Sequence, residues 1–188
     1  MKNEHEIMAR DTASYLPVFS RYPIVLDHGE GSYVWDVNGR KYLDALGGIA
    51  VNVLGHNYVP LVEAIANQAK RLIHVSNLYY TEPQADAAAK LSGLTAGGKV
   101  FFGNSGAEAN EGAIKAARKY GHTIHPEKSQ IITALGSFHG RTLATLTATG
   151  QEKFHKGFEP LPQGFDYVPF NDIAALETQM NENTAAVM

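Results

Sequence analysis

The 188-residue sequence contains no cysteine, and this absence removes several classes of protein from consideration. Without thiols there is no disulfide framework, no zinc–thiolate site and no cysteine nucleophile, and a reducing compartment is permitted. No apolar run approaches the roughly 20 residues of a transmembrane helix. The start, MKNEHEIMAR, lacks the apolar segment of a signal peptide. These absences favour a soluble, cytoplasmic protein.

Neither sign of charge is in large excess. With 16 basic and 19 acidic residues the net charge is −3, and there is no long basic run, so nucleic acid and membranes are poor candidates as partners. The histidines are scattered: His122 and His125 lie three apart without an H-E-x-x-H pattern, which predicts no metal site. The sequence has no G-x-S-x-G motif, which argues against a serine hydrolase.

What is present is an alternation of helical and strand patterns. A hairpin is predicted where Asn38-Gly39, a type I′ turn signal, separates SYVWDV from RKYLDA. An amphipathic helix follows Pro60, and a second begins at Thr81 with capping-box spacing to Gln84. From Glu82 onward helices alternate with the apolar runs VFF, QIITAL, FDYVPF and TAAVM. This order predicts an α/β fold around a mainly parallel sheet.

The segment FFGNSGAEANEGAIKAARKYG combines a strand, a glycine-rich turn and a helix. Ser105 and Glu108 have the spacing of a capping box, and Gly121 is placed like a C′ glycine that ends the helix. Glu111 and Lys115 are spaced for an i,i+4 ion pair. We therefore expect residues 100–102 to form a buried strand and a helix to run from about Gly106 to Gly121.

A helix that begins after a glycine-rich turn can bind an anion. Its first N–H groups are unpaired and carry partial positive charge, and glycines at Gly103 and Gly106 let a phosphate approach the backbone. The local pattern fits an ordinary strand–helix connection equally well. The spacing matches neither a P-loop nor a G-x-G-x-x-G dinucleotide motif.

A second polar segment, GSFHGRT, also follows a predicted strand. Phe138 could stack on a heteroaromatic ring or plug the core, and Arg141 could bind a carboxylate or form a surface ion pair. No neighbour in the sequence orients His139 as a base, so a role in shaping the loop is favoured over catalysis.

Taken together, these segments resemble the class III aminotransferases, which use pyridoxal phosphate. FFGNSGAEANEGAIKAARKYG, the following SFHGRTLATLTATGQEKFHKGFEPLPQGFDYVPFND, and YLPVFSRYPIVLDHGEGSYVWDVNGRKYLDALGGIAVNVLGH near the start carry the likeness. It implies the α/β fold type I of these enzymes. Residues 1–58 would belong to the small domain, with its β-hairpin, and residues 59–188 would form the first half of the large cofactor-binding domain.

The resemblance also implies roles for individual residues. Ser105, Gly106 and Ala107 match the turn that binds the cofactor phosphate, Phe138 the aromatic residue on the pyridine ring, and Arg141 the arginine for the substrate α-carboxylate. Tyr15 and the SNLYY segment, around Asn77 and Tyr79, match regions near the active site at a subunit interface, which implies a homodimer with a shared site.

The activity implied is transfer of an amino group between N2-acetylornithine and 2-oxoglutarate. Another ω-amino transaminase, acting on ornithine, succinylornithine or 4-aminobutyrate, is the nearest alternative, and a non-catalytic phosphate-binding module is the alternative from a different class. Because the sequence stops as a strand begins, we expect an N-terminal part of a longer enzyme. The Schiff-base lysine would then lie beyond Met188, with no catalytic residue in this chain, which we expect to be inactive alone.

Overall fold

A computed structural model describes residues 3–188, and the chain divides into two compact units at the Tyr80–Thr81 junction. The predicted boundary between residues 58 and 59, which refers to the domains of a whole enzyme, stays a prediction. Among the described residues, none of the helices has the length and apolar character needed to cross a membrane.

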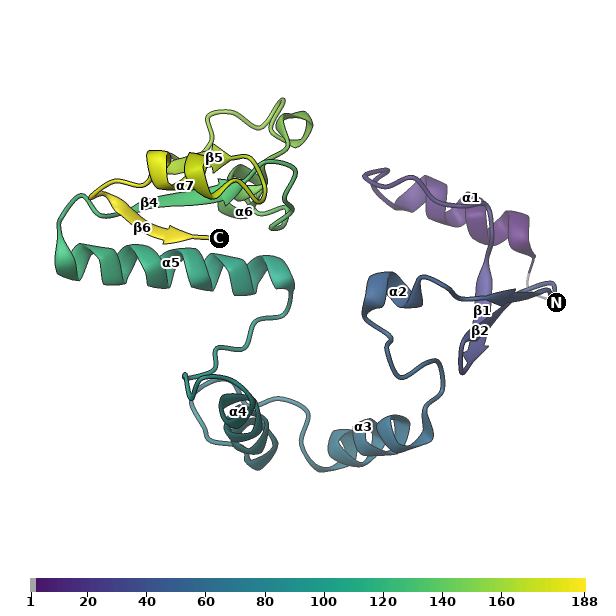
Figure 1. The fold of residues 1–188 in the computed structure, drawn as a ribbon. Helices are drawn as coiled ribbons and strands as arrows, with labels where there is room; N and C mark the ends of the chain where they lie inside the picture. The colour runs from purple at the N-terminus through teal and green to yellow at the C-terminus, as the bar shows by residue number, and fades with distance from the viewer. Residues whose placement is uncertain (1–2) are drawn as a thin grey trace. The chain divides into compact units, whose positions relative to one another are not determined.

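The first unit is built on a small antiparallel sheet (Figure 1). The strands β1 (Leu26–Glu30), β2 (Tyr33–Asp36) and β3 (Lys41–Leu43) follow one another in sheet order, so β2 lies at the centre. The helix α1 (Glu4–Ser14) precedes the sheet, and α2 (Gly47–Ala50) and α3 (Val59–Arg71) follow it. Pro60 lies in the first turn of α3, as predicted.

The predicted hairpin forms between β2 and β3, but its turn is of a different type. Trp35 pairs with Lys41, and the N–H of Asp36 donates to the carbonyl of Arg40, so three residues rather than two form the loop. Only Gly39 has a positive φ, 79°, and its N–H donates to the Asp36 carbonyl at 3.0 Å. A type I turn followed by a left-handed glycine therefore replaces the predicted type I′ turn.

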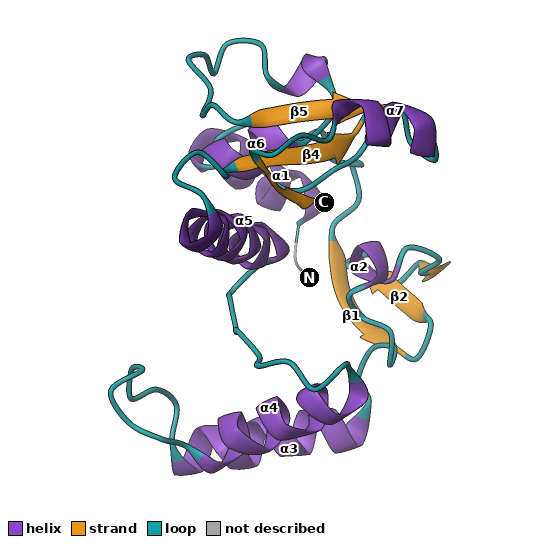
Figure 2. Cartoon of the chain, turned by 60° about the vertical axis from the view of Figure 1, so that its left-hand side comes forward, coloured by secondary structure: helices purple, strands orange, loops and turns teal. Residues whose placement is uncertain are grey.

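The second unit has the predicted parallel sheet, with strand order β5-β4-β6 (Figure 2). The strand β4 (Gln130–Ala134) is central and buried, flanked by β5 (Phe165–Val168) and β6 (Thr184–Val187). The remaining elements are α4 (Glu82–Leu94), α5 (Gly106–Ile124), α6 (Leu143–Ala148), the short 3₁₀ helix η1 (Glu152–Phe154) and α7 (Ile173–Gln179). The helices α5 and α6 contact each other and the sheet, and α7 contacts β5.

Four sequence predictions about local structure in this unit are wrong. Residues 100–102 form no strand and find no strand partner in the described chain; Phe101 and Phe102 are exposed. Glu111 and Lys115 form no ion pair, because Glu111 accepts a hydrogen bond from the Thr142 hydroxyl instead. Thr81 precedes α4 but makes no side-chain cap.

The fourth correction concerns Gly121, which does not end α5. The helix continues to Ile124, and Gly121 is buried against the segment before β4. A Cβ at this position would lie 2.1 Å from the carbonyl oxygen of Lys128 and 3.2 Å from the Cβ of Ala185. The glycine is required for close packing of the helix against residues 128 and 185, not for a left-handed cap.

Candidate active site

The beginning of α5 is fixed by a cluster of polar side chains. Ser105, in extended conformation, caps the helix: its hydroxyl accepts from the Glu108 N–H at 3.2 Å and donates to the Glu108 carboxylate at 3.1 Å. The side-chain amide of Asn104 donates to the same carboxylate at 3.0 Å. These hydrogen bonds, from Asn104 first and then Ser105, lower the pKa of Glu108. The predicted helix start is therefore confirmed.

The first N–H groups of α5 remain available to a ligand. Among the described residues, no hydrogen-bond acceptor is assigned to the N–H of Gly106 or of Ala107. A Cβ built on Gly106 would meet no atom within 4 Å, so the space on the side-chain side of this residue is open. Unpaired donors, a helix N-terminus and an open approach together suit an oxyanion such as a phosphate.

The segment 136–142 lies directly against this helix start. A Cβ on Gly140 would lie 2.7 Å from the Cβ of Ala107, so the two loops are in contact through a glycine. The Asn110 side chain donates to the carbonyl of His139 at 2.7 Å, and Thr142 donates to Glu111 at 2.5 Å. Packing and hydrogen bonds thus hold the two predicted site segments together within one unit.

Phe138 and Arg141 extend from the second of these segments. Phe138 is 59% exposed, so it is not a plug in the core of this unit. The Arg141 guanidinium carbon lies 5.4 Å from the centroid of the Phe138 ring and 4.4 Å from that of Phe154. Within the described residues Arg141 has no carboxylate partner, which removes the surface ion pair that its sequence context also allowed.

His139 has a role in the loop, as its sequence context suggested. Its N–H donates to the Thr149 hydroxyl at 3.0 Å, and its carbonyl accepts from Asn110. The ring Nε2 is buried and has no partner among the described residues. Burial lowers the pKa of this imidazole, which favours the neutral ring.

Sequence reasoning missed the residues that support the second loop from behind. The ring Nε2 of His155 lies 2.9 Å from the carbonyl of Leu146 and 2.8 Å from that of Thr149, at the end of α6. The side chain of Gln151 donates to the carbonyl of Ser137 at 2.9 Å. Hydrogen bonds from a side chain to carbonyls 6, 9 or 14 residues away leave no recognisable sequence pattern, so nothing in the sequence singled these two residues out.

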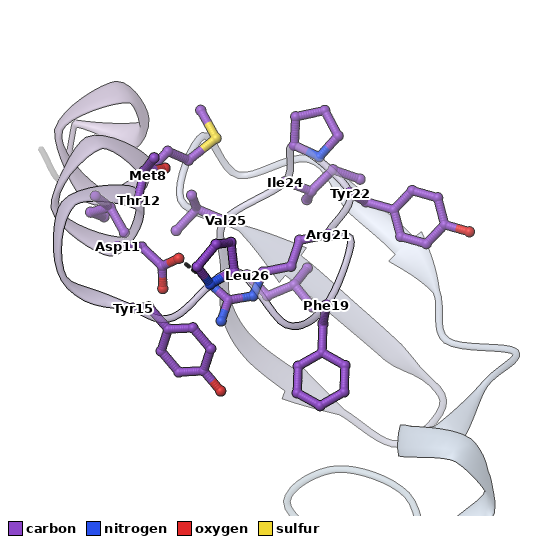
Figure 3. Close-up of a pocket in the computed structure, with 13 residues that line it drawn as sticks. Met8, Asp11, Thr12, Tyr15, Phe19, Arg21, Tyr22, Ile24, Val25 and Leu26 are labelled. Atoms are coloured by element: carbon purple, nitrogen blue, oxygen red, sulfur yellow. Dashed lines mark hydrogen bonds and ion pairs between the residues drawn. The ribbon is translucent and has the colours of Figure 1, made fainter. Parts of the chain in front are cut away.

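The first unit contains the other predicted site residues. Tyr15 lines a cavity of about 560 Å³ between α1 and residues 17–26 (Figure 3). The guanidinium carbon of Arg21 lies 4.2 Å from the centroid of the Tyr15 ring, and Arg21 also forms an ion pair with Asp11. Asn77 and Tyr79 are exposed near the end of the unit. Their approach to the segment predicted to bind the phosphate therefore stays a prediction.

Comparison with known proteins is consistent with this geometry. The family model for aminotransferase class III matches residues 16–188. An acetylornithine aminotransferase from Caldanaerobacter subterraneus is 58% identical over 174 residues, covering 92% of this chain and 44% of that protein. One from Methanothermobacter thermautotrophicus is 48% identical over 186 residues, covering 99% and 46%. The chain thus spans about half the length of these relatives.

Solved structures give the same result. The chain matches the ornithine aminotransferase of Toxoplasma gondii with a TM-score of 0.93 at 28% identity, covering 100% of this chain and 45% of that one. It matches an acetylornithine aminotransferase from Elizabethkingia anophelis with a TM-score of 0.79 at 32% identity, covering 100% and 44%. The chain belongs to the class III aminotransferases, and the predicted α/β fold type I is confirmed.

Proposed function

We propose that this chain is part of a pyridoxal-phosphate-dependent transaminase that transfers an amino group between N2-acetylornithine and 2-oxoglutarate. The observation that carries the proposal is the contact, through Gly140 and Ala107, between an open helix N-terminus and a loop bearing an exposed aromatic ring and an unpaired arginine. The names of the two relatives at 58% and 48% identity support the choice of substrate.

The residues present suit the cofactor. The N–H groups of Gly106 and Ala107, with the hydroxyl of Ser105, would hold its phosphate, and Phe138 would contact the face of its pyridine ring. When bound, pyridoxal phosphate supplies the electron sink for amino-group transfer. The backbone donors are fixed in direction by the cap at Ser105, so no reorganisation is needed when the anion binds.

Arg141 would bind the α-carboxylate of the amino donor and of the oxo acid. A planar guanidinium can donate two parallel hydrogen bonds to one carboxylate, and Arg141 has no acidic partner among the described residues. Arg141→Lys keeps the charge but loses the paired donors. In the complete protein this change should raise KM for both substrates while cofactor content stays near that of the parent; loss of cofactor with substrate affinity kept would contradict the assignment.

The phosphate assignment is tested by Gly106→Val. The Cβ of the new side chain would meet no protein atom within 4 Å, so we expect folding to be kept while the added bulk hinders the approach of the phosphate. We expect cofactor affinity, measured by absorbance titration of the complete protein, to fall at least tenfold, with little change in melting temperature. Gly98→Val, at another glycine with open surroundings, is the control. Parental cofactor affinity in Gly106→Val would place the phosphate elsewhere.

Ornithine is a second candidate for the amino donor. The structural likeness to an ornithine aminotransferase, with a TM-score of 0.93, favours ornithine as the alternative amino donor. Comparison of kcat/KM for N2-acetylornithine, ornithine, succinylornithine and 4-aminobutyrate decides between them. We further propose that the complete protein is a cytoplasmic homodimer whose subunits share each active site. Sedimentation of the complete protein tests the oligomeric state.

A further inference from the structure

Phe154 contacts the arginine proposed to bind substrate more closely than Phe138 does. The Arg141 guanidinium carbon lies 4.4 Å from the Phe154 ring centroid and 5.4 Å from that of Phe138. We propose that Phe154 is a positioning residue, which holds the Arg141 guanidinium by a cation–π contact so that its N–H edge faces the substrate carboxylate. This inference rests on the proposed function and concerns the orientation of one side chain within it.

A comparison with other arginines of the chain supports this role. Arg118 and Arg21 also lie over aromatic rings, at 4.9 Å from Phe165 and 4.2 Å from Tyr15. Arg118, however, donates to backbone carbonyls at residues 129, 163 and 164, and Arg21 pairs with Asp11. The N–H groups of these two arginines therefore already have acceptors within the protein.

Arg141 differs because rings contact it while its donors have no acceptor in the described chain. A ring that stacks on a guanidinium contacts the π face, and the five N–H donors lie in the guanidinium plane and stay free. A carboxylate ligand could therefore bind at the edge without displacing the ring contact. A carboxylate from the protein would instead compete for the same donors. An aromatic contact can therefore hold the guanidinium in place and still leave its N–H donors available to a substrate carboxylate.

Phe154 is itself held firmly relative to the loop that carries Arg141. Its N–H donates to the Gln151 carbonyl at 3.0 Å, and the Gln151 side chain donates to the Ser137 carbonyl at 2.9 Å. The next residue, His155, is within hydrogen-bond distance of two carbonyls at the end of α6. Since both are acceptors, the ring Nε2 carries the proton. Phe154 therefore lies on a short helix tied to both ends of the segment 137–149.

The ring of Phe154 has a second cation nearby, which provides a control. Lys153 Nζ lies 4.8 Å from its centroid. If Phe154 acts through Arg141, removing the Lys153 charge should leave substrate binding unchanged. If the ring matters only for local packing, changes at Phe154 should affect stability and all ligands alike.

The experiment uses the complete protein loaded with pyridoxal phosphate. Phe154→Leu keeps an apolar side chain but removes the π face, Phe154→Tyr restores it, and Lys153→Met is the matched control. We measure KM and kcat for both substrates, cofactor content by absorbance, and, as a readout without turnover, binding of 2-oxoglutarate by calorimetry. For Phe154→Leu we expect oxo-acid affinity to fall about fivefold, the size expected for one cation–π contact near the surface. Phe154→Tyr and Lys153→Met should bind like the parent.

Combining the substitutions separates this inference from the proposed function. If Arg141→Met, which removes the cation, weakens 2-oxoglutarate binding and Phe154→Leu adds nothing further in the double variant, the two residues act together, as expected. If Arg141→Met has its effect but Phe154→Leu binds like the parent, the positioning role is wrong and the proposed function stands. If Arg141→Met leaves binding unchanged, the substrate assignment itself fails. Should Phe154→Leu not fold, Gln151→Ala, which unties η1 from Ser137, must weaken binding in the same direction; unchanged binding overturns the inference.

Discussion

The two units of this chain are stabilised by different interactions. In the second unit several large apolar side chains are buried together with a group of threonines; Ile131 and Ile132 on β4, Leu146 on α6 and Ile114 on α5 are the large apolar ones. In the first unit, the buried side chains are those of Val34 and Asp36, and many apolar side chains are exposed, including Tyr22, Ile49 and Ile73. The sheet of the first unit therefore depends on polar contacts much more than the sheet of the second.

Asp36 is the centre of those polar contacts. Only 2% exposed, its carboxylate accepts from the backbone N–H groups of Asn38 and Arg40, from the Arg40 Nε at 2.7 Å and from the Tyr42 hydroxyl at 2.9 Å. Burial alone would raise its pKa, but these hydrogen bonds outweigh it and lower the pKa to about 2. The hairpin turn is thus organised around one buried charge.

A second polar cluster holds a strained turn in the first unit. The residues labelled α2, Gly47–Ala50, all have positive φ, including 58° at Ile49, which is unfavourable for a β-branched residue. Asp44 accepts from the N–H groups at 46 and 47 and lies 2.8 Å from the His56 ring, which Asn52 contacts on its other nitrogen. The hydrogen bond to His56 contributes most to lowering the pKa of Asp44.

This contrast predicts that the second unit is most sensitive to loss of apolar volume. Ile132 is fully buried in β4, so Ile132→Ala should lower the free energy of unfolding by about 2–5 kcal/mol. Circular dichroism should show the loss, whereas the fluorescence of the only tryptophan, Trp35 in the first unit, should keep its midpoint. Ile173→Ala, at an exposed position of α7, is the control. Equal shifts of both signals would mean that the units do not unfold separately.

The first unit should instead be most sensitive to loss of charge at Asp36. Asp36→Asn places an amide donor among groups that donate, and we expect the Trp35 fluorescence midpoint to fall by several degrees. Because the folded-state pKa lies below the ordinary 3.8, the stabilisation is fully present above that pH and is lost as the pH falls toward 2. Glu30→Gln, at an exposed position of β1, should change neither. If the pH midpoint of acid unfolding were the same in Asp36→Asn as in the parent, the Asp36 carboxylate would not be the group that stabilises this unit.

Two glycines of α5 should respond in opposite ways. Gly121→Ala forces a Cβ against the Lys128 carbonyl and should destabilise the second unit by about 1–3 kcal/mol. Gly106→Ala, where the space is open, should leave stability equal or slightly higher. Urea unfolding followed by circular dichroism compares them. Similar losses in both variants would show that glycine is needed at the helix start for folding, which would weaken the case for a ligand there.

The smallest expected effect concerns the helix cap. Ser105→Ala removes the acceptor for the Glu108 N–H and should cost about 1 kcal/mol. Ser105→Asp keeps an acceptor and should restore most of the stability. The negative charge of Asp should nevertheless repel a phosphate, so this variant should fold well and bind pyridoxal phosphate poorly. Good cofactor binding by Ser105→Asp would argue against an anion at this helix start.

Much of the second unit could be predicted from the sequence because its signals are local. The apolar run QIITAL gave β4, and Ser105 followed three residues later by Glu108 gave the start of α5. Both depend on interactions between residues close in sequence, or on burial that a continuous apolar run reveals. The family motifs then supplied the candidate roles of residues 105–107, Phe138 and Arg141.

Only the tertiary structure decided the rest, because the deciding contacts join different segments of the chain, beyond the reach of one helical turn or one hairpin. Gly121 looked like a helix end, but contact with residue 128 makes it a packing position. The run 100–102 has strand composition, yet a strand requires a partner, and the described chain provides none. The sequence assigned no individual role to Phe154, and its closeness to Arg141 depends on the folding of this segment, in which Gln151 and His155 bind carbonyls of residues 137, 146 and 149. The sequence by itself determines local conformation where backbone hydrogen bonds and a capping side chain are enough to fix it. Where one residue type can play several roles, as glycine can at a helix end or in a close contact, tertiary packing decides which role it has.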